Sequence, residues 1–383
     1  MKYFIIAGEA SGDTHAADLV RAIKKGDGNA SFAFVGGEAL SEATGEAPIV
    51  HYSGMAFMGV WEVLKHLGTI RKYAKKVQQA LLEFSPDVVI PVDYPGFNFR
   101  YILPFVKEQL PSARLYYYIS PKVWAWKKKR IAKLRTQTDK VLCILPFEVD
   151  FFKKHDLHQA VYVGNPTLAG VKRFLQEKPH LNGKNIHPEE RDTINRKPVC
   201  AILCGSRTAE IRANLPVMIR AAEEVEGGCH IIIAGAPGQK EDLYASIPEA
   251  KGYPILFGHT FDILSRSHVA MVTSGTATLE TCLLGTPQVV CYAHGAGYLA
   301  NFVFKRFFSV PFISLVNLIA DRPVVQELFG GKFTTKRVKE EIEKILKNKN
   351  YMHAMLTGYE NVSEKLGESD ASERAAEEIC KRD

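Results

Sequence analysis

The chain has 383 residues, of which 46% are hydrophobic and 24% charged, and its formal net charge is +7. These values exclude a disordered or fibrous chain, and the length exceeds what one ordinary core holds, so two domains are expected. The seven cysteines include no Cys-x-x-Cys pair and lie mostly in apolar runs, which favours buried thiols in a reducing compartment over a disulfide framework or a zinc site.

Short apolar runs alternate with segments of helical period over residues 2–164. This alternation is typical of a parallel sheet covered by helices on both faces. Apolar residues at three- and four-residue steps predict an amphipathic helix over residues 60–83, which ends before Pro86. The expected strands are KYFIIA (2–7), SFAFVG (31–36), PDVVIPVD (86–93), ARLYYYI (113–119), KVLCIL (140–145) and AVYVG (160–164).

The segment AGEASGD, residues 7–13, follows the first of these strands and precedes a helix. Its outline is that of a phosphate-binding turn, in which backbone N–H groups and a helix N-terminus face an anion. However, it carries two carboxylates, Glu9 and Asp13. Either the outline is misleading, or the ligand of this turn is not the nucleotide.

The segment VDYPGFNFR, residues 92–100, places Asp93 at the carboxyl end of a strand. A carboxylate at a strand end that faces a cleft is well placed to act as a general base. A turn or helix cap is the alternative role for Asp93.

The segment YYYISPKVWAWKKKRIAKLR, residues 116–135, joins two tryptophans to a basic stretch. Such residues can stack on a nucleic acid, seat at an anionic membrane surface, or form a solvated helix face whose indoles anchor to the core. Nucleic acid is the least favoured of the three, because the chain has no RNA-binding signature. The residues of this segment that would contact a membrane are Trp124, Trp126, Lys127 and Lys128.

A polar, charged stretch at residues 171–197 indicates a linker, after which strand-like runs resume. Two Rossmann-like doubly wound α/β domains facing a cleft are therefore expected, over residues 1–170 and 171–345. The charged helical segment at about 346–383 can pack back on the first domain. The expected strands are PVCAILC, CHIIIAG, YPILF, VAMVT and QVVCYA.

Two strand–turn–helix segments of the second domain are candidates for binding an anion. In VTSGTATLE, residues 272–280, the N–H groups that follow Ser274 can face a phosphate, and Glu280 can reach ribose hydroxyls. In LCGSRTAEI, residues 203–211, Arg207 is suited to neutralising a diphosphate. The alternatives are an ordinary capped turn and a surface arginine, and neither segment matches the P-loop or the G-x-G-x-x-G fingerprint.

The segment YLANFVFKRFFSVPFISL, residues 298–315, is aromatic and apolar around Lys305 and Arg306. It is either core or a shallow membrane-surface helix. The apolar run at 307–320 is shorter than the roughly 20 residues of a spanning helix, and the N-terminal run is too short for a signal peptide. We therefore expect a cytoplasmic protein without a transmembrane segment.

The segments AGEASGD, MGVWEVL, VDYPGFN, SPKVWAWKKKR, LPFE, YVGNP, GSRTAEI and SGTATLE, in this order, resemble the lipid-A-disaccharide synthase family over residues 3 to about 330. The resemblance implies a GT-B glycosyltransferase at the inner face of the bacterial cytoplasmic membrane. The implied reaction joins UDP-2,3-diacylglucosamine to 2,3-diacylglucosamine 1-phosphate with inversion, giving a β(1→6) disaccharide and UDP. No cofactor is implied, and the sequence shows no clustered metal ligands or Asp-x-Asp pair.

Residue roles follow from the same resemblance. Asp93 and Arg207 correspond to catalytic residues, and Asn98 is the motif companion of Asp93. Glu9, Ser11, Gly12 and Asp13 fall in the acceptor-side loop. The residues on the donor side are Ser206, Arg207, Ser274, Gly275, Thr276, Ala277, Glu280, Asn317 and Glu327.

The sequence departs from the family pattern at three positions: Cys204 replaces a proline, Gly96 an aspartate and Asn165 a frequent histidine. His15 has no motif counterpart. Other classes stay open: a murein glycosyltransferase, a UDP-sugar 2-epimerase, or a non-enzymatic membrane-peripheral nucleotide or lipid sensor. The expected partners are a UDP-sugar donor, an acylated acceptor and a membrane surface, but no nucleic acid, and a homodimer is compatible with the charged tail.

Overall fold

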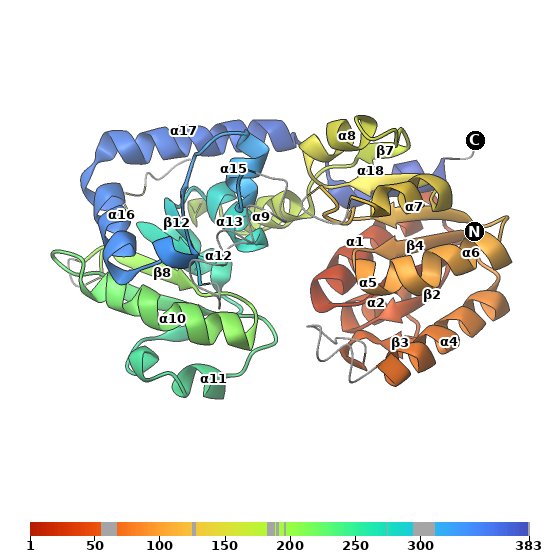
Figure 1. Ribbon diagram of the computed structural model, residues 1–383, viewed down its shortest axis with the longest axis horizontal. Helices are drawn as coiled ribbons and strands as arrows, with labels where there is room; N and C mark the ends of the chain where they lie inside the picture. The colour runs from red at the N-terminus through yellow and green to blue at the C-terminus, as the bar shows by residue number, and fades with distance from the viewer. Residues whose placement is uncertain are drawn as a thin grey trace. The chain divides into compact units, whose positions relative to one another are not determined.

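The computed structural model describes residues 1–54, 67–124, 128–181, 188, 191–194, 197–273, 275–293 and 311–381. The chain forms two compact units, one of Met1–Pro166 with Glu368–Asp383 and one of Thr167–Gly367 (Figure 1). The sequence predicted a domain boundary at residue 170, and the first unit ends at Pro166. The returning segment begins at Glu368, later than residue 346, because the helix before it packs within the second unit.

In its described residues, the first unit contains a seven-stranded parallel sheet in the order β3-β2-β1-β4-β5-β6-β7. Its strands are β1 (Lys2–Ala7), β2 (Ser31–Gly36), β3 (Val50–His51), β4 (Val88–Val92), β5 (Arg114–Tyr118), β6 (Lys140–Cys143) and β7 (Ala160–Tyr162). Its helices are α1 (Ala10–Gly26), α2 (Glu38–Thr44), α4 (Leu67–Phe84), α5 (Pro95–Phe97), α6 (Leu103–Gln109), α7 (Arg130–Gln137), α8 (Pro146–Lys153) and α18 (Ala371–Cys380).

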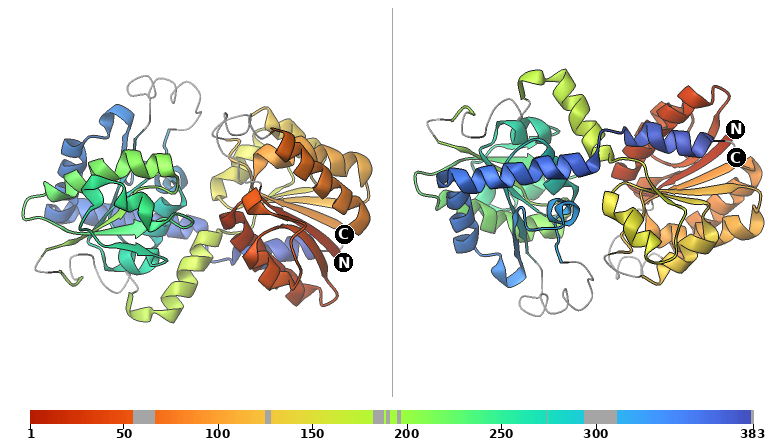
Figure 2. Two further views of the ribbon diagram at one scale, coloured as in Figure 1. Left: turned by 90° about the horizontal axis from the view of Figure 1, so that it is seen from below. Right: turned by 90° about the horizontal axis from the view of Figure 1, so that it is seen from above.

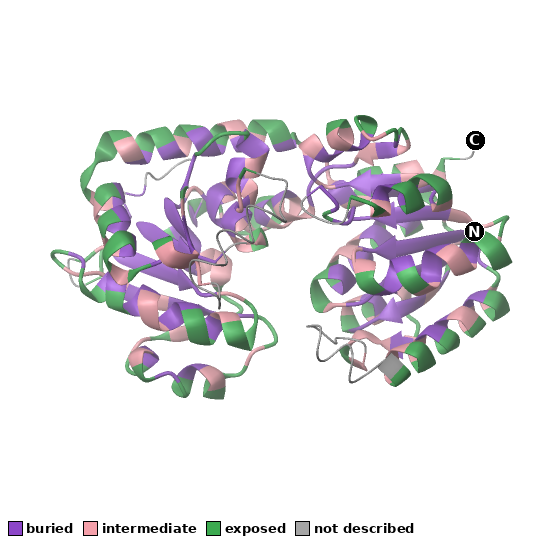
Figure 3. Cartoon of the chain, viewed as in Figure 1, coloured by how far each residue is buried: buried purple, intermediate pink, exposed green. Residues whose placement is uncertain are grey.

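Both faces of this sheet are buried, which explains why its strands are apolar throughout (Figures 2 and 3). Along β1, Tyr3 and Ile5 pack against α1, α2 and α18, whereas Phe4 and Ile6 pack against α4, α6 and α7. The helix expected at 60–83 is described from Leu67 onward, and its residues 60–66 lie outside the described part.

The second unit contains, in its described residues, a six-stranded parallel sheet in the order β10-β9-β8-β11-β12-β13. Its strands are β8 (Val199–Leu203), β9 (His230–Gly235), β10 (Ile255–Phe257), β11 (Val269–Val272), β12 (Gln288–Tyr292) and β13 (Gln326–Phe329). Its helices are α9 (Pro166–Glu177), α10 (Thr208–Glu223), α11 (Glu241–Ala245), α12 (Thr260–Arg266), α13 (Thr276–Leu283), α15 (Leu315–Ala320), α16 (Thr335–Lys347) and α17 (Lys349–Leu366). The expected α/β class with two doubly wound sheets is confirmed.

One buried cation anchors the linker to the second unit. Arg191 is 7% exposed and donates to the carbonyl oxygens of Leu264, Ser267 and Gly285 and to the hydroxyl of Thr286. Burial lowers the pKa of Arg191 to about 10. The linker, which is polar by composition, is therefore held through backbone carbonyl groups and one hydroxyl of the second unit.

The returning chain completes the core of the first unit. Ala375 and Ile379 of α18 pack in the cluster that α1 shares with the sheet, and Lys140 pairs with Glu378 at 2.7 Å. The chain passes so close to Gly164 that a Cβ there would lie 2.7 Å from the Ser369 carbonyl oxygen. Gly164 has φ +103°, so glycine is favoured at this position both by its conformation and by the close approach.

Candidate active site

The first sheet changes its direction of growth between β1 and β4, since β1 continues to β2 and β4 continues to β5. In doubly wound sheets, ligands bind at the carboxyl ends of the strands at such a switch point. Glu9 follows β1 and Asp93 follows β4, so the fold brings together two carboxylates that lie far apart in the sequence.

The backbone at Asp93 is held in an unusual conformation. Asp93 and Tyr94 have φ values of 44° and 47°, a left-handed region that non-glycine residues rarely adopt. The Asp93 carbonyl accepts hydrogen bonds from Asn98 Nδ2 at 2.7 Å and Tyr117 Oη at 2.6 Å. Tyr94 packs against Gly8, where a Cβ would lie 2.2 Å from the ring. Asn98 therefore positions the Asp93 backbone, and it begins a π-helical turn (Asn98–Ile102), a feature frequent at functional sites.

The Asp93 carboxyl is half-buried, and its environment disfavours ionisation. Burial is the larger cause and the charge of Glu9 the second, and together they raise the pKa of Asp93 to about 6 although Lys122 acts in the opposite direction. A carboxylate with a pKa close to neutrality is a stronger base than an ordinary surface aspartate and still ionises at physiological pH.

The four candidate residues that follow β1 have different environments. Glu9 is half-buried, and its Oε1 accepts a hydrogen bond from the exposed Ser11 at 3.3 Å. Asp13 is only 2% exposed, and it accepts the N–H groups of Gly37 at 2.6 Å and Ala39 at 3.0 Å. Asp13 thus holds the turn before α2, which accounts for one of the two carboxylates in structural terms. Gly12 is buried beside it in α1.

Two further residues near this edge, Asn165 and His15, are at least half-buried in the first unit. Asn165 is 1% exposed, and its side chain donates to the Ile144 carbonyl at 2.9 Å. His15 lies half-buried on α1, and burial lowers the pKa of its imidazole.

The switch point of the second sheet lies between β8 and β11. The Gly205–Arg207 turn follows β8, and the start of α13 follows β11, so both anion-binding candidates lie at the same edge of the sheet. Buried Asn214 joins these turns: its Nδ2 donates to Cys204 O and Thr273 Oγ1, both at 3.0 Å, and its Oδ1 accepts from Ala293 N at 2.8 Å. One side chain therefore connects the ends of β8, β11 and β12.

The turn that carries Arg207 wraps around Glu210. The Glu210 carboxylate accepts from Ser206 N at 3.3 Å and Arg207 N at 3.4 Å, and it pairs with Arg207 Nη1 at 3.2 Å. Gly205 has φ +114°, and a Cβ there would lie 2.8 Å from Glu210 Cβ. Glu210 and Asn214 thus order the turn in which Cys204 replaces the family's proline. Sequence analysis missed both residues because polar positions on a helix normally indicate a solvated face.

At the start of α13, Gly275 adopts φ +142° and its carbonyl accepts from Thr278 Oγ1 at 2.8 Å. Thr276 is exposed and Ala277 half-buried. Burial raises the pKa of Glu280 to about 7, and within the described part of the chain its carboxyl makes no hydrogen bond. Glu280 is thus a half-buried carboxyl available to a ligand's hydroxyl groups. Ser274 lies outside the described residues.

The side chain of Asn317, a candidate for binding substrate, is buried among protein partners. Asn317 is 1% exposed, and its Nδ2 donates to Val325 O and Glu327 Oε1, both at 2.9 Å. Its Oδ1 accepts from Val324 N at 2.7 Å and Val325 N at 2.9 Å. Because these four bonds use the full capacity of the amide, it has none left for a ligand. Glu327 is half-buried and accepts from Ser314 N and Oγ, at 2.8 and 2.7 Å, at the start of α15.

Trp124, a candidate for membrane contact, is also buried. Its indole is 5% exposed, stacks edge-on against Phe147 and donates to Glu148 Oε1 at 2.9 Å. Burial raises the pKa of Glu148 to about 7. Lys128 is exposed, with Nζ 6.0 Å from the Phe151 ring centroid. The remaining membrane candidates, Trp126, Lys127, Lys305 and Arg306, lie outside the described residues.

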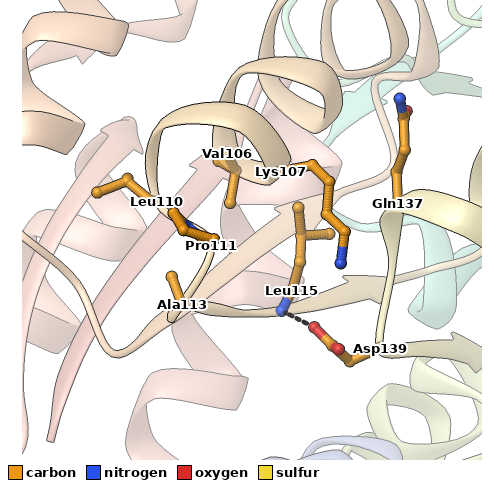
Figure 4. A pocket seen from close by; sticks show the side chains of 8 residues that line it. All are labelled: Val106, Lys107, Leu110, Pro111, Ala113, Leu115, Gln137 and Asp139. Carbon is orange, nitrogen blue, oxygen red and sulfur yellow. Dashed lines mark hydrogen bonds between the residues drawn. The ribbon is translucent and has the colours of Figure 1, made fainter.

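A small pocket lies at the opposite, amino-terminal edge of the first sheet (Figure 4). Its volume of about 30 Å³ accommodates a water-sized ligand and not a sugar. There the Asp139 carboxylate accepts the Leu115 N–H at 2.6 Å.

Across the described ranges, no helix is both long and apolar enough to span a membrane, and no group of three His, Cys, Asp or Glu side chains is arranged to hold a metal ion.

The family model for lipid-A-disaccharide synthetase matches residues 3–379. The chain is 35% identical over 383 residues to the lipid-A-disaccharide synthase of Myxococcus xanthus, covering 99% of this chain and 96% of that one. It is 34% identical over 378 residues to that of Syntrophus aciditrophicus, covering 97% and 95%.

Solved structures share the two-sheet architecture. The S. aureus MnaA–UDP co-structure has a TM-score of 0.67 at 12% identity and covers 99% of this chain and 95% of that one. The UDP-GlcNAc 2-epimerase from Neisseria meningitidis bound to UDP-GlcNAc has a TM-score of 0.62 at 11% identity, with 99% of both chains covered. At such low identity these likenesses show the GT-B fold alone. The sequence match, in contrast, extends over nearly the whole chain, so the chain belongs to the lipid-A-disaccharide synthetase family and is a glycosyltransferase of lipid A biosynthesis.

Proposed function

We propose that this enzyme transfers 2,3-diacylglucosamine from its UDP derivative to the C6 hydroxyl of 2,3-diacylglucosamine 1-phosphate. The products are the β(1→6) disaccharide 1-phosphate and UDP. The observation that carries the proposal is Asp93: it lies at the switch point of the first sheet, next to Glu9, with its pKa raised to about 6.

In this mechanism Asp93 is the general base. It accepts the proton of the acceptor hydroxyl as that oxygen attacks the anomeric carbon of the donor from the face opposite UDP. The new C–O bond forms while the bond from the anomeric carbon to the UDP oxygen breaks, so the configuration inverts. Glu9 and Ser11 bind acceptor hydroxyls, because both are accessible at the same switch point. A positioned base typically contributes about 10²–10⁴-fold.

The second unit holds UDP in this proposal. Arg207 is 59% exposed at the carboxyl edge of the sheet, and its guanidinium neutralises the charge that develops on the departing diphosphate. Glu280 accepts hydrogen bonds from ribose hydroxyls. The N–H groups that contribute to diphosphate binding belong to Ser206, Ser274, Gly275, Thr276 and Ala277.

The acyl chains of both substrates support a peripheral position at the inner face of the cytoplasmic membrane. In this proposal Lys128 contacts anionic headgroups together with Trp126, Lys127, Lys305 and Arg306. No part of the reaction as proposed uses a cofactor or a metal ion.

The test is an assay of the purified enzyme with both lipid substrates, with and without EDTA. Disaccharide and UDP formation should survive EDTA and should fall at least about 10²-fold in Asp93→Ala and Arg207→Ala, since each removes a group that acts in the transition state. Exposed positions provide matched controls, Asp192→Ala and Arg212→Ala, which should keep wild-type rates. Full activity in Asp93→Ala would remove the base from the mechanism.

A UDP-sugar 2-epimerase is the second candidate, because solved epimerases share the fold. It predicts a different outcome: inversion at C2 of UDP-GlcNAc without any acceptor, visible by NMR. The sensor alternative predicts UDP binding without turnover. Release of UDP that depends on the acceptor would exclude both.

A further inference from the structure

Two cations on the chain between β5 and β6, Lys122 and Arg130, take no part in the mechanism described above. Lys122 is exposed on the segment that follows β5, and its charge acts on the carboxyls of Asp93 and Glu148. Arg130 begins α7, and its guanidinium stacks on the Phe99 ring with Cζ 4.9 Å from the centroid. We propose that Arg130 and Lys122 bind the 1-phosphate of the acceptor, an inference that rests on the function proposed above.

The position of Arg130 follows from its contacts. Phe99 also packs against Tyr117, with ring centroids 5.9 Å apart, and Tyr117 Oη donates to the Asp93 carbonyl at 2.6 Å. Arg130 is thus connected to the Asp93 backbone through two packed rings. Since β4 and β5 are neighbours, the segments that follow them start about 5 Å apart. In glucosamine the ring oxygen joins C1, which carries the phosphate, to C5, which carries C6, so the phosphate lies within one sugar of the attacking hydroxyl.

The electrostatics leave both cations available to an anion. Within the described ranges neither Arg130 nor Lys122 forms an ion pair with a carboxylate. The Arg130 guanidinium is partly desolvated, and burial lowers its pKa. A partly desolvated guanidinium without a carboxylate partner gains from a bidentate phosphate, which carries a charge of about −1.5 to −2 at pH 7. The guanidinium lies over the Phe99 ring, a contact that restricts its motion before a ligand binds.

The experiment compares two acceptors, 2,3-diacylglucosamine with and without its 1-phosphate. The readout is the ratio of their kcat/KM values. Arg130→Met keeps the apolar stem on Phe99 but removes the charge, and it should reduce this ratio roughly tenfold or more, mainly through the KM of the phosphorylated acceptor. Lys122→Met should act in the same direction, and Arg130→Lys should retain part of the ratio.

The matched control is Arg135→Met on the same helix, since Arg135 faces Asp156 at 3.8 Å on an exposed surface and should leave the ratio unchanged. An unchanged ratio in a folded Arg130→Met variant would overturn the inference. If the wild type makes no disaccharide at all, the proposed function fails instead. Calorimetric titration of the two lipids then tests the phosphate site separately. Equal affinities of the wild type for the two lipids would reject the site. An Arg130→Met variant that still prefers the phosphorylated lipid would reject it as well.

Discussion

At the scale of single residues, the candidate base depends on a second carboxylate that has no proton to transfer in the mechanism. Glu9 lies beside Asp93 and raises its pKa, in addition to the larger effect of burial. Burial, and after it the charge of Glu9, also raises the pKa of Tyr94. In the proposed mechanism Glu9 therefore has two roles: it binds acceptor hydroxyls and it raises the pKa of the candidate base.

The corresponding prediction concerns the pH dependence of kcat/KM. Asp93 must be deprotonated to accept a proton, so activity should rise with pH through a limb near 6. Glu9→Gln removes a negative charge that favours the protonated form, so the pKa of Asp93 should fall and the limb should move to lower pH. A pH series for wild type and variant measures this shift.

The control is Glu42→Gln, since Glu42 is an exposed carboxylate that lies 3.8 Å from Arg21 on a different surface. The acidic limb of kcat/KM in Glu42→Gln should lie at the same pH as in the wild type. If the acidic limb of kcat/KM does not move in Glu9→Gln, the charge of Glu9 does not affect the pKa of Asp93.

At the scale of elements, one amide on α10 connects three strand ends. Because Asn214 is buried and its bonds reach the segments that follow β8, β11 and β12, its loss affects both turns proposed to hold UDP. Asn214→Ala should lower the free energy of unfolding by about 2–4 kcal/mol and weaken UDP binding. Asn214→Asp should be worse, because it removes the donor and places a charge against the Cys204 carbonyl. Thermal unfolding measures the loss of stability, and calorimetric titration measures the affinity for UDP. Wild-type values of both in Asn214→Ala would show that the two turns are ordered without the Asn214 side chain.

The elements that the sequence predicted are those whose pattern is local. The long apolar strands and the two glycine turns were placed correctly, because burial on both faces leaves a continuous apolar run. β3 was missed because it is only two residues long, and β13 because it begins with the polar Gln326 and Glu327.

Individual side chains were harder to assign. Asn317 and Asp13 carry polar groups in matching motifs, yet the structure uses them on backbone N–H and carbonyl groups distant in sequence. No local pattern separates a ligand-binding amide from one that satisfies its own backbone. Asn214 was missed for the same reason, because its partners follow three different strands. Glu210 has local partners, Ser206 and Arg207, but a polar residue in the first turn of a helix normally indicates a solvated face.

At the scale of the whole molecule, the chain leaves the first unit after Pro166 and returns after Gly367, so the first unit is complete only once the last helix has packed. α18 contributes Ala375 and Ile379 to a core formed mainly by residues 1–163. The three tryptophans, Trp61, Trp124 and Trp126, all belong to the first unit, whereas Arg207 and Glu280 belong to the second. Tryptophan fluorescence therefore reports on the unfolding of the first unit, whereas UDP binding, as proposed above, reports on the second.

Gly164→Ala should consequently destabilise the first unit alone. The added Cβ would lie 2.7 Å from the Ser369 carbonyl and would force an alanine to φ +103°, so we expect the returning segment to be displaced at a cost of about 2 kcal/mol or more. The fluorescence midpoint in urea should fall while the Kd for UDP stays unchanged. Gly170→Ala is the matched control, because a Cβ there meets no atom within 4 Å and the helix favours alanine. A midpoint in Gly164→Ala equal to that in Gly170→Ala would mean that the returning segment does not depend on the close approach at Gly164.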